Sequence, residues 1–251
     1  PKIIQGKISI KNLRFSYSRG EEVINGINLE IQPSETIAIV GSTGAGKSTL
    51  INLLSRFYEY DSGQIYLDEM SIRDFSIKSL RGHLGVVLQE VFLFADTIFN
   101  NITLKNPDIS IEMVRRVAKE IGVDKFIESL PEGYNYNLKE RGAMLSSGQR
   151  QLIAFLRVYI SNPSILILDE ATSSIDSNSE ELIKIATSKI TKNKTSIIIA
   201  HRLSTIKNAD RIVVMDKGKI VEIGTHDDLL KIKGGFYAKL SRIEFLDNVL
   251  V

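Results

Sequence analysis

The sequence contains no cysteine, and its 32 lysine and arginine residues nearly balance its 30 aspartate and glutamate residues. The absence of cysteine excludes disulfides, thiolate zinc sites and thiol nucleophiles, and it fits a reducing compartment. The formal net charge of +2 excludes a strongly basic nucleic-acid surface and an acidic tail. The function must therefore be sought in local motifs.

Long apolar runs are missing as well. No run approaches the ~18–20 apolar residues that a membrane-spanning helix needs. The start of the chain, from Pro1 to Gln5, does not have the pattern of a signal peptide. We therefore expect the chain as given to be soluble. Because it opens without Met, it can still be the soluble part of a larger protein.

The apolar patterns that are present indicate an α/β domain. Period-two alternation predicts half-exposed antiparallel strands at residues 8–11, 27–31 and 64–68. Runs that are apolar on both faces predict buried strands of a parallel sheet at Thr36–Val40, Ile165–Leu168, Ser196–Ala200 and Arg211–Met215. From about Thr97 to Leu130 the apolar positions fall at helical spacing. We expect one domain over residues 1–251, with a helical subdomain inserted at about residues 90–160.

A glycine-rich motif follows the first of these buried runs and opens a helix. It matches G-x-x-x-x-G-K-[ST] and consists of Gly41, Ser42, Thr43, Gly44, Ala45, Gly46, Lys47 and Ser48, with Thr49 next. Glycines let successive backbone N–H groups converge on phosphate oxygens, and the helix N-terminus adds partial positive charge. Lys47 would reach the β- and γ-phosphates, and the Ser48 hydroxyl would bind Mg²⁺. The motif predicts a nucleotide phosphate site.

Acidic residues and a histidine follow two other buried runs. Asp169 and Glu170 come directly after Ile165–Leu168, and His201 follows Ser196–Ala200. The carboxyl ends of parallel strands share one edge of a sheet, where the phosphate loop also lies. Asp169 is therefore placed to hold Mg²⁺, and Glu170 to orient or deprotonate the attacking water. A single histidine after a buried strand is more often structural, so His201 is at this point either a structural residue or a sensor of the γ-phosphate.

The segment between these elements carries a resemblance to a known family. Leu145-Ser146-Ser147-Gly148-Gln149 runs straight into a helical pattern. Together with the phosphate loop and the strand that ends in Asp169-Glu170, it is similar to the signature of ATP-binding-cassette (ABC) ATPases. The resemblance covers about Lys7 to Leu240. It implies an α/β fold with a P-loop NTPase (RecA-like) core, an N-terminal antiparallel β-subdomain and an inserted α-helical subdomain.

The resemblance also implies roles for individual residues, with ATP and Mg²⁺ as the ligands. Tyr17 matches the aromatic residue that stacks on the adenine. Gln89 matches the glutamine that contacts Mg²⁺ and the attacking water and couples to the membrane domain. Asp176 matches a loop acid that meets the partner subunit, and His201 matches the switch histidine.

The signature implies a dimer. Ser146, Gly148 and Gln149 precede or begin a helix, and in the family they close over ATP held by a second subunit in a head-to-tail arrangement. Ser147 stands where the family usually has glycine. If that position needs a positive φ or a close backbone approach, the side chain would weaken the closed site modestly. Whether the partner is identical stays open.

Several segments resemble the exporter branch of the family. They are Asp96–Ile102, Glu140-Arg141-Gly142, Glu170–Asp176 and Ala200–Ile206, although Asn137-Leu138-Lys139 departs from the usual acidic-x-Gly. Exporters carry this domain after a transmembrane domain, so we expect that domain to precede Pro1 in the intact protein. The implied location is the cytoplasmic face of the cell (inner) membrane.

Three other classes of ABC protein are less consistent with the sequence. A DNA-directed ATPase would need long coiled-coil heptads between the motifs, and none is present. A ribosome-binding member would normally carry two cassettes and a basic linker. A non-catalytic regulatory cassette would be expected to lose Lys47, Asp169, Glu170 or His201, and all four are present. The hypothesis is an exporter motor that hydrolyses ATP.

Overall fold

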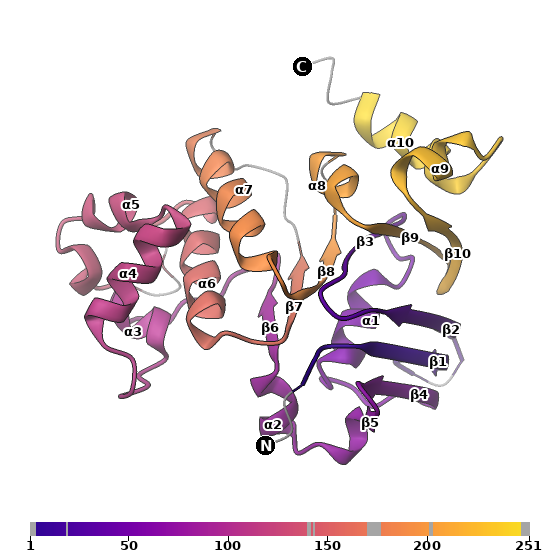
Figure 1. The fold of residues 1–251 in the computed structure, drawn as a ribbon, viewed down its shortest axis with the longest axis horizontal. Coiled ribbons are helices and arrows are strands. Elements are labelled where there is room, and N and C mark those ends of the chain that lie inside the picture. The colour runs from indigo at the N-terminus through magenta and orange to yellow at the C-terminus, as the bar shows by residue number, and fades with distance from the viewer. Residues whose placement is uncertain are drawn as a thin grey trace. The chain divides into compact units, whose positions relative to one another are not determined.

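The chain divides into two compact units, and each is described by itself (Figure 1). The computed structural model describes residues 4–18, 20–139, 142, 144–169, 177–200 and 203–246. The first unit comprises Pro1–Leu84, Ser164–Glu170 and Asn193–Val251, and the second comprises Gly85–Pro163 and Ala171–Lys192. Three stretches far apart in the sequence therefore build the first unit.

An antiparallel sheet in the first unit has the strand order β2-β1-β4-β5. Its strands are β1 (Ile8–Phe15), β2 (Ile24–Ile31), β4 (Ser62–Leu67) and β5 (Met70–Ser71). Ile10 of the central strand lies opposite Leu29 on one side and Ile65 on the other, and all three are buried. The alternating pattern in the first third of the sequence predicts this sheet, because alternate side chains face the core.

A second sheet in the first unit runs in the order β10-β9-β3-β8-β7. Its strands are β3 (Thr36–Val40), β7 (Ile165–Asp169), β8 (Thr195–Ile199), β9 (Arg211–Asp216) and β10 (Lys219–Gly224). The strands β9, β3, β8 and β7 are parallel, whereas β10 is antiparallel to β9. The sheet is thus mixed, because the antiparallel strand β10 lies at one edge. The sequence patterns did not predict β10. The carboxyl ends of β3, β7 and β8 share one edge.

The helices of the first unit are short. They are α1 (Lys47–Leu54), α2 (Ile77–Gly82), α8 (Leu203–Asn208), α9 (His226–Lys231) and α10 (Phe236–Leu246), with the 3₁₀ turn η1 (Ile72–Asp74). Helix α1 begins at Lys47, inside the glycine-rich motif, and buries Leu50, Ile51 and Leu53. It connects the central strand β3 to the antiparallel sheet, so it spans the core of this unit.

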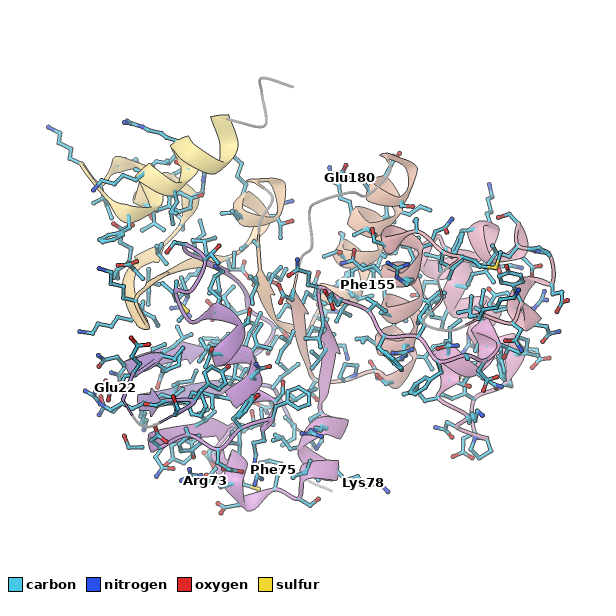
Figure 2. The ribbon with its side chains drawn as sticks, turned by 180° about the vertical axis from the view of Figure 1, so that it is seen from behind. Glu22, Arg73, Phe75, Lys78, Phe155 and Glu180 are labelled. Atoms are coloured by element: carbon cyan, nitrogen blue, oxygen red, sulfur yellow. The ribbon has the colours of Figure 1, made fainter. Side chains whose placement is uncertain are left out.

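The second unit is mainly helical. The strand β6 (Leu84–Val87) leads into it, and its helices are α3 (Ile98–Thr103), α4 (Ile111–Ile121), α5 (Asp124–Glu128), α6 (Ser147–Ser161) and α7 (Ser177–Thr191), with the 3₁₀ turn η2 (Gly133–Asn135). In α4 the buried residues Val114, Val117, Ala118 and Ile121 fall at the spacing that the sequence predicts. Helix α6 lies against α3, α4 and α7, and its residue Phe155 is buried (Figure 2).

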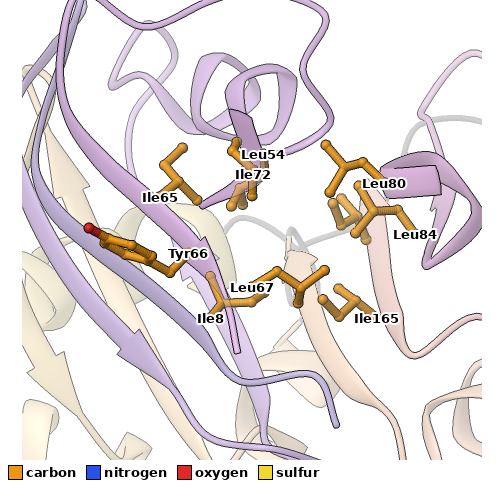
Figure 3. Close-up of a pocket in the computed structure, with 10 residues that line it drawn as sticks. Ile8, Leu54, Ile65, Tyr66, Leu67, Ile72, Leu80, Leu84 and Ile165 are labelled. Atoms are coloured by element: carbon orange, nitrogen blue, oxygen red, sulfur yellow. The ribbon is translucent and has the colours of Figure 1, made fainter. Parts of the chain in front are cut away.

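A small gap in the core of the first unit is lined by apolar side chains (Figure 3). Its lining comes from both sheets and from α1 and α2, and includes Ile8, Ile65, Leu80 and Ile165. Tyr66 supplies the one polar side chain of that lining. Because its lining is apolar, this gap cannot bind phosphate, and it matters only for the packing of the core.

We expect Ile65→Ala to destabilise the chain by about 2–5 kcal/mol, because the fully buried side chain already borders this gap and its loss would enlarge it. Ile65→Val should cost only ~0.5–1.5 kcal/mol. Urea unfolding followed by circular dichroism measures both. Equal unfolding midpoints for wild type and Ile65→Ala would contradict the packing argument.

Candidate functional site

The phosphate loop lies between β3 and α1, and its shape depends on glycine. Gly41, Gly44 and Gly46 have φ values of 153°, 81° and 100°, in the region that favours glycine. A Cβ atom on Gly41 would lie 2.2 Å from the carbonyl oxygen of Met215, so any side chain there is excluded. A Cβ on Gly44 would meet nothing within 4 Å, which leaves open space on that side of the loop.

The loop combines a buried cation with open backbone hydrogen-bond donors. Lys47 is only 9% exposed, and its ammonium donates to the carbonyl oxygens of Gly41 at 2.6 Å and Ser42 at 3.0 Å. Within the described part of the chain, the N–H groups of Thr43, Gly44 and Gly46 donate no hydrogen bond. Open N–H donors, a lysine and a helix N-terminus together fit the phosphates of a nucleotide.

A hairpin between β9 and β10 supports the loop from behind. Lys217 and Gly218 both have positive φ, as a two-residue hairpin turn requires. The N–H of Gly218 donates to the carbonyl of Ala45 at 3.1 Å, and its carbonyl accepts from Asn25 at 2.8 Å. This contribution was not predicted from the sequence. The dipeptide Lys217-Gly218 between two short strand patterns is the signal that predicts such a turn.

Tyr17 lies beside the start of α1. Its ring is half exposed, and its hydroxyl lies 3.1 Å from the hydroxyl of Thr49. The rings of Phe15 and Tyr58 contact it edge to face. The exposed ring is therefore held next to the phosphate loop, where it can stack on a base.

Two of the oxygen ligands expected for Mg²⁺ come from the first unit. Ser48 is exposed in the first turn of α1, and Asp169 is the half-buried last residue of β7, opposite Ile199 of β8. A hydroxyl and a carboxylate fit the preference of Mg²⁺ for oxygen. Among the described residues, no group of three or more histidine or acidic side chains could hold a metal ion. Glu170, Asp176 and His201 lie outside the described residues.

Gln89 and the signature belong to the second unit. Gln89 is exposed just after β6. Ser146 caps α6: its Oγ accepts from the N–H of Gln149 at 3.2 Å, and its own N–H donates to Gln149 Oε1 at 3.0 Å. Gly148 is buried in the first turn.

Ser147 does not strain the backbone. It is the first residue of α6 and is not among the residues with positive φ. A side chain at N1 of a helix is compatible with helical φ and ψ. The conformational objection to serine at this position therefore does not hold in this chain.

The comparisons with known proteins agree with these features. A model of the family described as "ABC transporter" matches residues 24–173, which is more than half of the chain. The chain belongs to the ABC transporter family. The ATP-binding domains of this family are ATPases, which confirms the expected enzyme class at the level of the family.

Curated relatives and a solved structure extend the match. The uncharacterized ABC transporter ATP-binding protein YknV of Bacillus subtilis is 45% identical over 96% of this chain and 40% of its own length. The ATP-dependent lipid A-core flippase of Hahella chejuensis is 47% identical over 96% and 42%. A bacterial Atm1-family ABC exporter with ATP bound superposes with a TM-score of 0.87 at 39% identity, over 95% of this chain and 42% of that chain.

These matches confirm the P-loop NTPase fold class and the resemblance to exporter ATP-binding domains. The chain spans about 40% of the length of the curated relatives it matches. Among the described residues, no helix is both long and apolar enough to cross a membrane.

The segment Asp96–Ile102 of this ABC domain is organised around one carboxylate. Asp96 accepts from the N–H of Thr97 at 2.8 Å and from Asn100 at 2.7 Å, and it pairs with Lys105 at 2.8 Å. These donors, Lys105 first, lower the pKa of the Asp96 carboxyl from 3.8 to about 2. Asp96 thereby fixes the start of α3.

We expect Asp96→Asn to destabilise the chain at neutral pH and to make much less difference in acid. The folded-state pKa lies below the unfolded value, so the stabilisation is present above about pH 4 and is lost as the pH falls through about 2. Urea unfolding of both chains across this range measures the difference. Asp108→Asn, an exposed aspartate of the same unit, is the control. A difference that is constant with pH would contradict this origin.

Proposed function

We propose that this chain is the ATP-binding and ATP-hydrolysing motor domain of an ABC exporter. In this proposal two such domains dimerise head to tail on ATP-Mg²⁺ and power the export of a substrate across a membrane. The observation that carries the proposal is the phosphate loop, in which a buried Lys47 and open N–H donors meet at the N-terminus of α1. Names of relatives that include flippase, exporter and permease support the transport part.

Binding of ATP is assigned to the first unit. The residues proposed to hold the phosphates are Gly41, Ser42, Thr43, Gly44, Ala45, Gly46, Lys47, Ser48 and Thr49. Tyr17 would stack on the adenine. Mg²⁺, held through Ser48, Gln89 and Asp169, would neutralise charge on the β- and γ-phosphate oxygens.

Hydrolysis is assigned to residues at the carboxyl edge of the sheet. A water oxygen attacks the γ-phosphorus, the bond from that phosphorus to the bridging oxygen breaks, and ADP leaves. Glu170 takes the proton of the water, and His201 contacts the γ-phosphate. Lys47 holds the γ-phosphate in line, so that charge developing on the phosphate oxygens is met by a cation already in position.

The proposed partners are a second nucleotide-binding domain and the transmembrane domains of the same transporter. Ser146, Gly148, Gln149 and Asp176 would meet the ATP site of the second domain. On the second unit, the rings of Phe92 and Phe94 are 58% and 52% exposed and lie edge to face at 5.1 Å. Large exposed rings on one unit are typical of a docking surface, which supports a membrane-domain partner at the cytoplasmic face of the membrane.

The free energy of ATP binding would drive the conformational change of the transporter. ATP held between two domains favours the closed dimer only if it contacts both of them, and the head-to-tail arrangement gives each ATP a loop from one chain and a signature from the other. Hydrolysis removes that preference and releases the dimer. This is the cycle that would drive the membrane domains between inward- and outward-facing states.

We expect Lys47→Ala to weaken ATP binding roughly 10- to 150-fold, because the phosphates lose a charge-assisted hydrogen bond in a desolvated site. Isothermal titration calorimetry with ATP-Mg²⁺ measures this. Lys78→Ala, at an exposed position of α2, is the matched control and should bind as wild type does. Wild-type affinity in Lys47→Ala would contradict the phosphate assignment.

We expect Glu170→Gln to bind ATP-Mg²⁺ and to accumulate as a dimer, because the substitution keeps the shape of the side chain and removes the carboxylate that drives turnover. Sedimentation velocity with and without ATP-Mg²⁺ measures the mass. The double variant Lys47→Ala/Glu170→Gln should stay monomeric. A Glu170→Gln monomer that binds ATP would contradict dimerisation of this domain by itself and point to a different partner domain, or to dimerisation that needs the transmembrane domain.

A further inference from the structure

Tyr58 is an exposed aromatic residue in the segment that follows α1, and none of the proposed roles uses it. It is 46% exposed, and its ring centroid lies 5.0 Å from that of Tyr17 at an interplanar angle of 88°. Phe15, which is buried, contacts both rings, at 4.9 Å from Tyr17 and 5.8 Å from Tyr58. The three rings form a closed aromatic set with Phe15 as its anchor.

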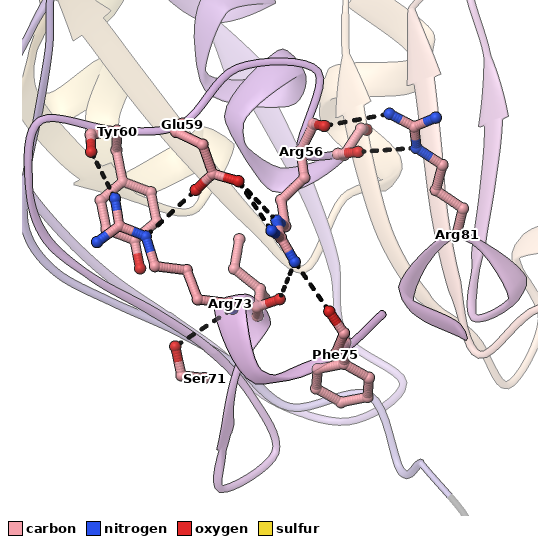
Figure 4. Close-up of polar contacts among 9 residues, drawn as sticks. Arg56, Glu59, Tyr60, Ser71, Arg73, Phe75 and Arg81 are labelled. Atoms are coloured by element: carbon pink, nitrogen blue, oxygen red, sulfur yellow. Dashed lines mark hydrogen bonds and ion pairs between the residues drawn. The ribbon is translucent and has the colours of Figure 1, made fainter. Parts of the chain in front are cut away.

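The turn that carries Tyr58 is held in place by Arg56 (Figure 4). Arg56 follows the C-cap of α1 with a φ of 48°. Its guanidinium donates to the carbonyl oxygens of Ile72 at 3.0 Å and Phe75 at 2.9 Å, and to Glu59 Oε1 at 2.9 Å and 3.0 Å. The residue two positions before Tyr58 is therefore fixed to the η1 segment.

Arg73 holds the other side of the same turn. It donates to Glu59 Oε2 at 3.2 Å and to the carbonyl of Tyr60 at 2.6 Å, and its guanidinium lies 3.7 Å from the centre of the Tyr60 ring. Burial raises the pKa of the Glu59 carboxyl, but Arg56 and Arg73 outweigh it and hold that pKa below its usual value. Glu59 thus stays ionised between two arginines, and Tyr58 is flanked by fixed residues.

The loop of Tyr17 is tied to the same turn through the backbone. The N–H of Ser16 donates to Asp61 Oδ2 at 2.8 Å, and the N–H of Asp61 donates to the carbonyl of Arg14 at 3.0 Å. With the contact between the hydroxyls of Tyr17 and Thr49, this places Tyr17 against α1 and the turn after it. The ring of Tyr58 contacts the Tyr17 ring from that turn, and half of Tyr17 stays exposed.

We propose that Tyr58 is a positioning residue for base recognition: it holds the ring of Tyr17 in the orientation that stacks on the adenine, and the turn Arg56–Asp61 is its rigid support. The inference rests on the proposed function. A half-exposed tyrosine on a loop loses rotamer freedom when it stacks, and this cost lowers affinity. Edge-to-face contact with Tyr58 restricts the ring before the base arrives.

The test distinguishes recognition of the base from recognition of the phosphates. Binding of ATP and of inorganic tripolyphosphate, each with Mg²⁺, is measured calorimetrically for the 251-residue chain and its variants. Tyr58→Ala should weaken ATP binding about 2- to 12-fold, the range of an edge-to-face ring contact, and should leave tripolyphosphate binding unchanged. Tyr58→Phe, which keeps the ring, should restore ATP affinity.

Two further variants sharpen the result. Phe57→Ala is the matched control, since Phe57 is an equally exposed neighbouring ring that packs on Arg81 at 4.6 Å. In the Tyr17→Ala background, Tyr58→Ala should have no further effect, because it acts only through Tyr17. Tyr58→Leu serves as a second variant, and unchanged tripolyphosphate binding reports that either variant is folded.

Four outcomes would overturn the inference. They are an unchanged ATP affinity in Tyr58→Ala, an equal loss for both ligands, a loss of the same size in Phe57→Ala, and a full additional loss in the Tyr17→Ala background, which would mean that Tyr58 touches the base itself. Failure of the proposed function gives a different result: the wild-type chain would then bind ATP no better than tripolyphosphate, or Lys47→Ala would bind both as wild type does.

Discussion

The close approach of the phosphate loop to the β9–β10 hairpin is the constraint on which the site depends. Gly41 faces the carbonyl of Met215, and a Cβ on Gly46 or Gly218 would lie 3.0 Å or 2.4 Å from the carbonyl of Val23. Backbone meets backbone at these points, so no side chain can intervene. Because the hairpin closes the loop from behind, the open side of the loop is the one on which a Cβ of Gly44 would meet nothing within 4 Å.

Burial of Lys47 follows from the same closure. A buried ammonium is costly unless its donors are satisfied, and the carbonyls of Gly41 and Ser42 satisfy them from within the loop. A phosphate that enters the loop therefore meets a cation that is already desolvated and oriented. The electrostatic attraction in such a site exceeds that of an exposed lysine.

Local sequence patterns predicted the strands and the helix around the site. The contacts between residues far apart in the sequence could not be predicted in this way. The run Thr36–Val40 matches β3 because it is apolar on both faces and ends at Gly41. Strand β10 escaped prediction because its more exposed positions carry Val221 and Ile223, against the usual alternation. The dipeptide Lys217-Gly218 marks a turn, but the residues that Gly218 and Tyr58 contact lie more than forty positions away in the chain, so no local pattern predicts these contacts. The backbone conformation at Ser147 could not be predicted from the motif either, because it depends on the residue at which α6 begins.

Helix α1 joins these contacts into one frame. Its N-terminus carries the phosphate loop, and Thr49 in its first turn meets the hydroxyl of Tyr17. At its C-terminal end, Arg81 of α2 donates to the carbonyls of Ser55 at 3.3 Å and Arg56 at 3.1 Å, a cation where the helix dipole is negative. The residues proposed for the base and for the phosphates thus contact one short helix whose core face is buried. A nucleotide that binds both sets would therefore meet groups attached to the same helix, which lowers the cost of ordering two separate loops.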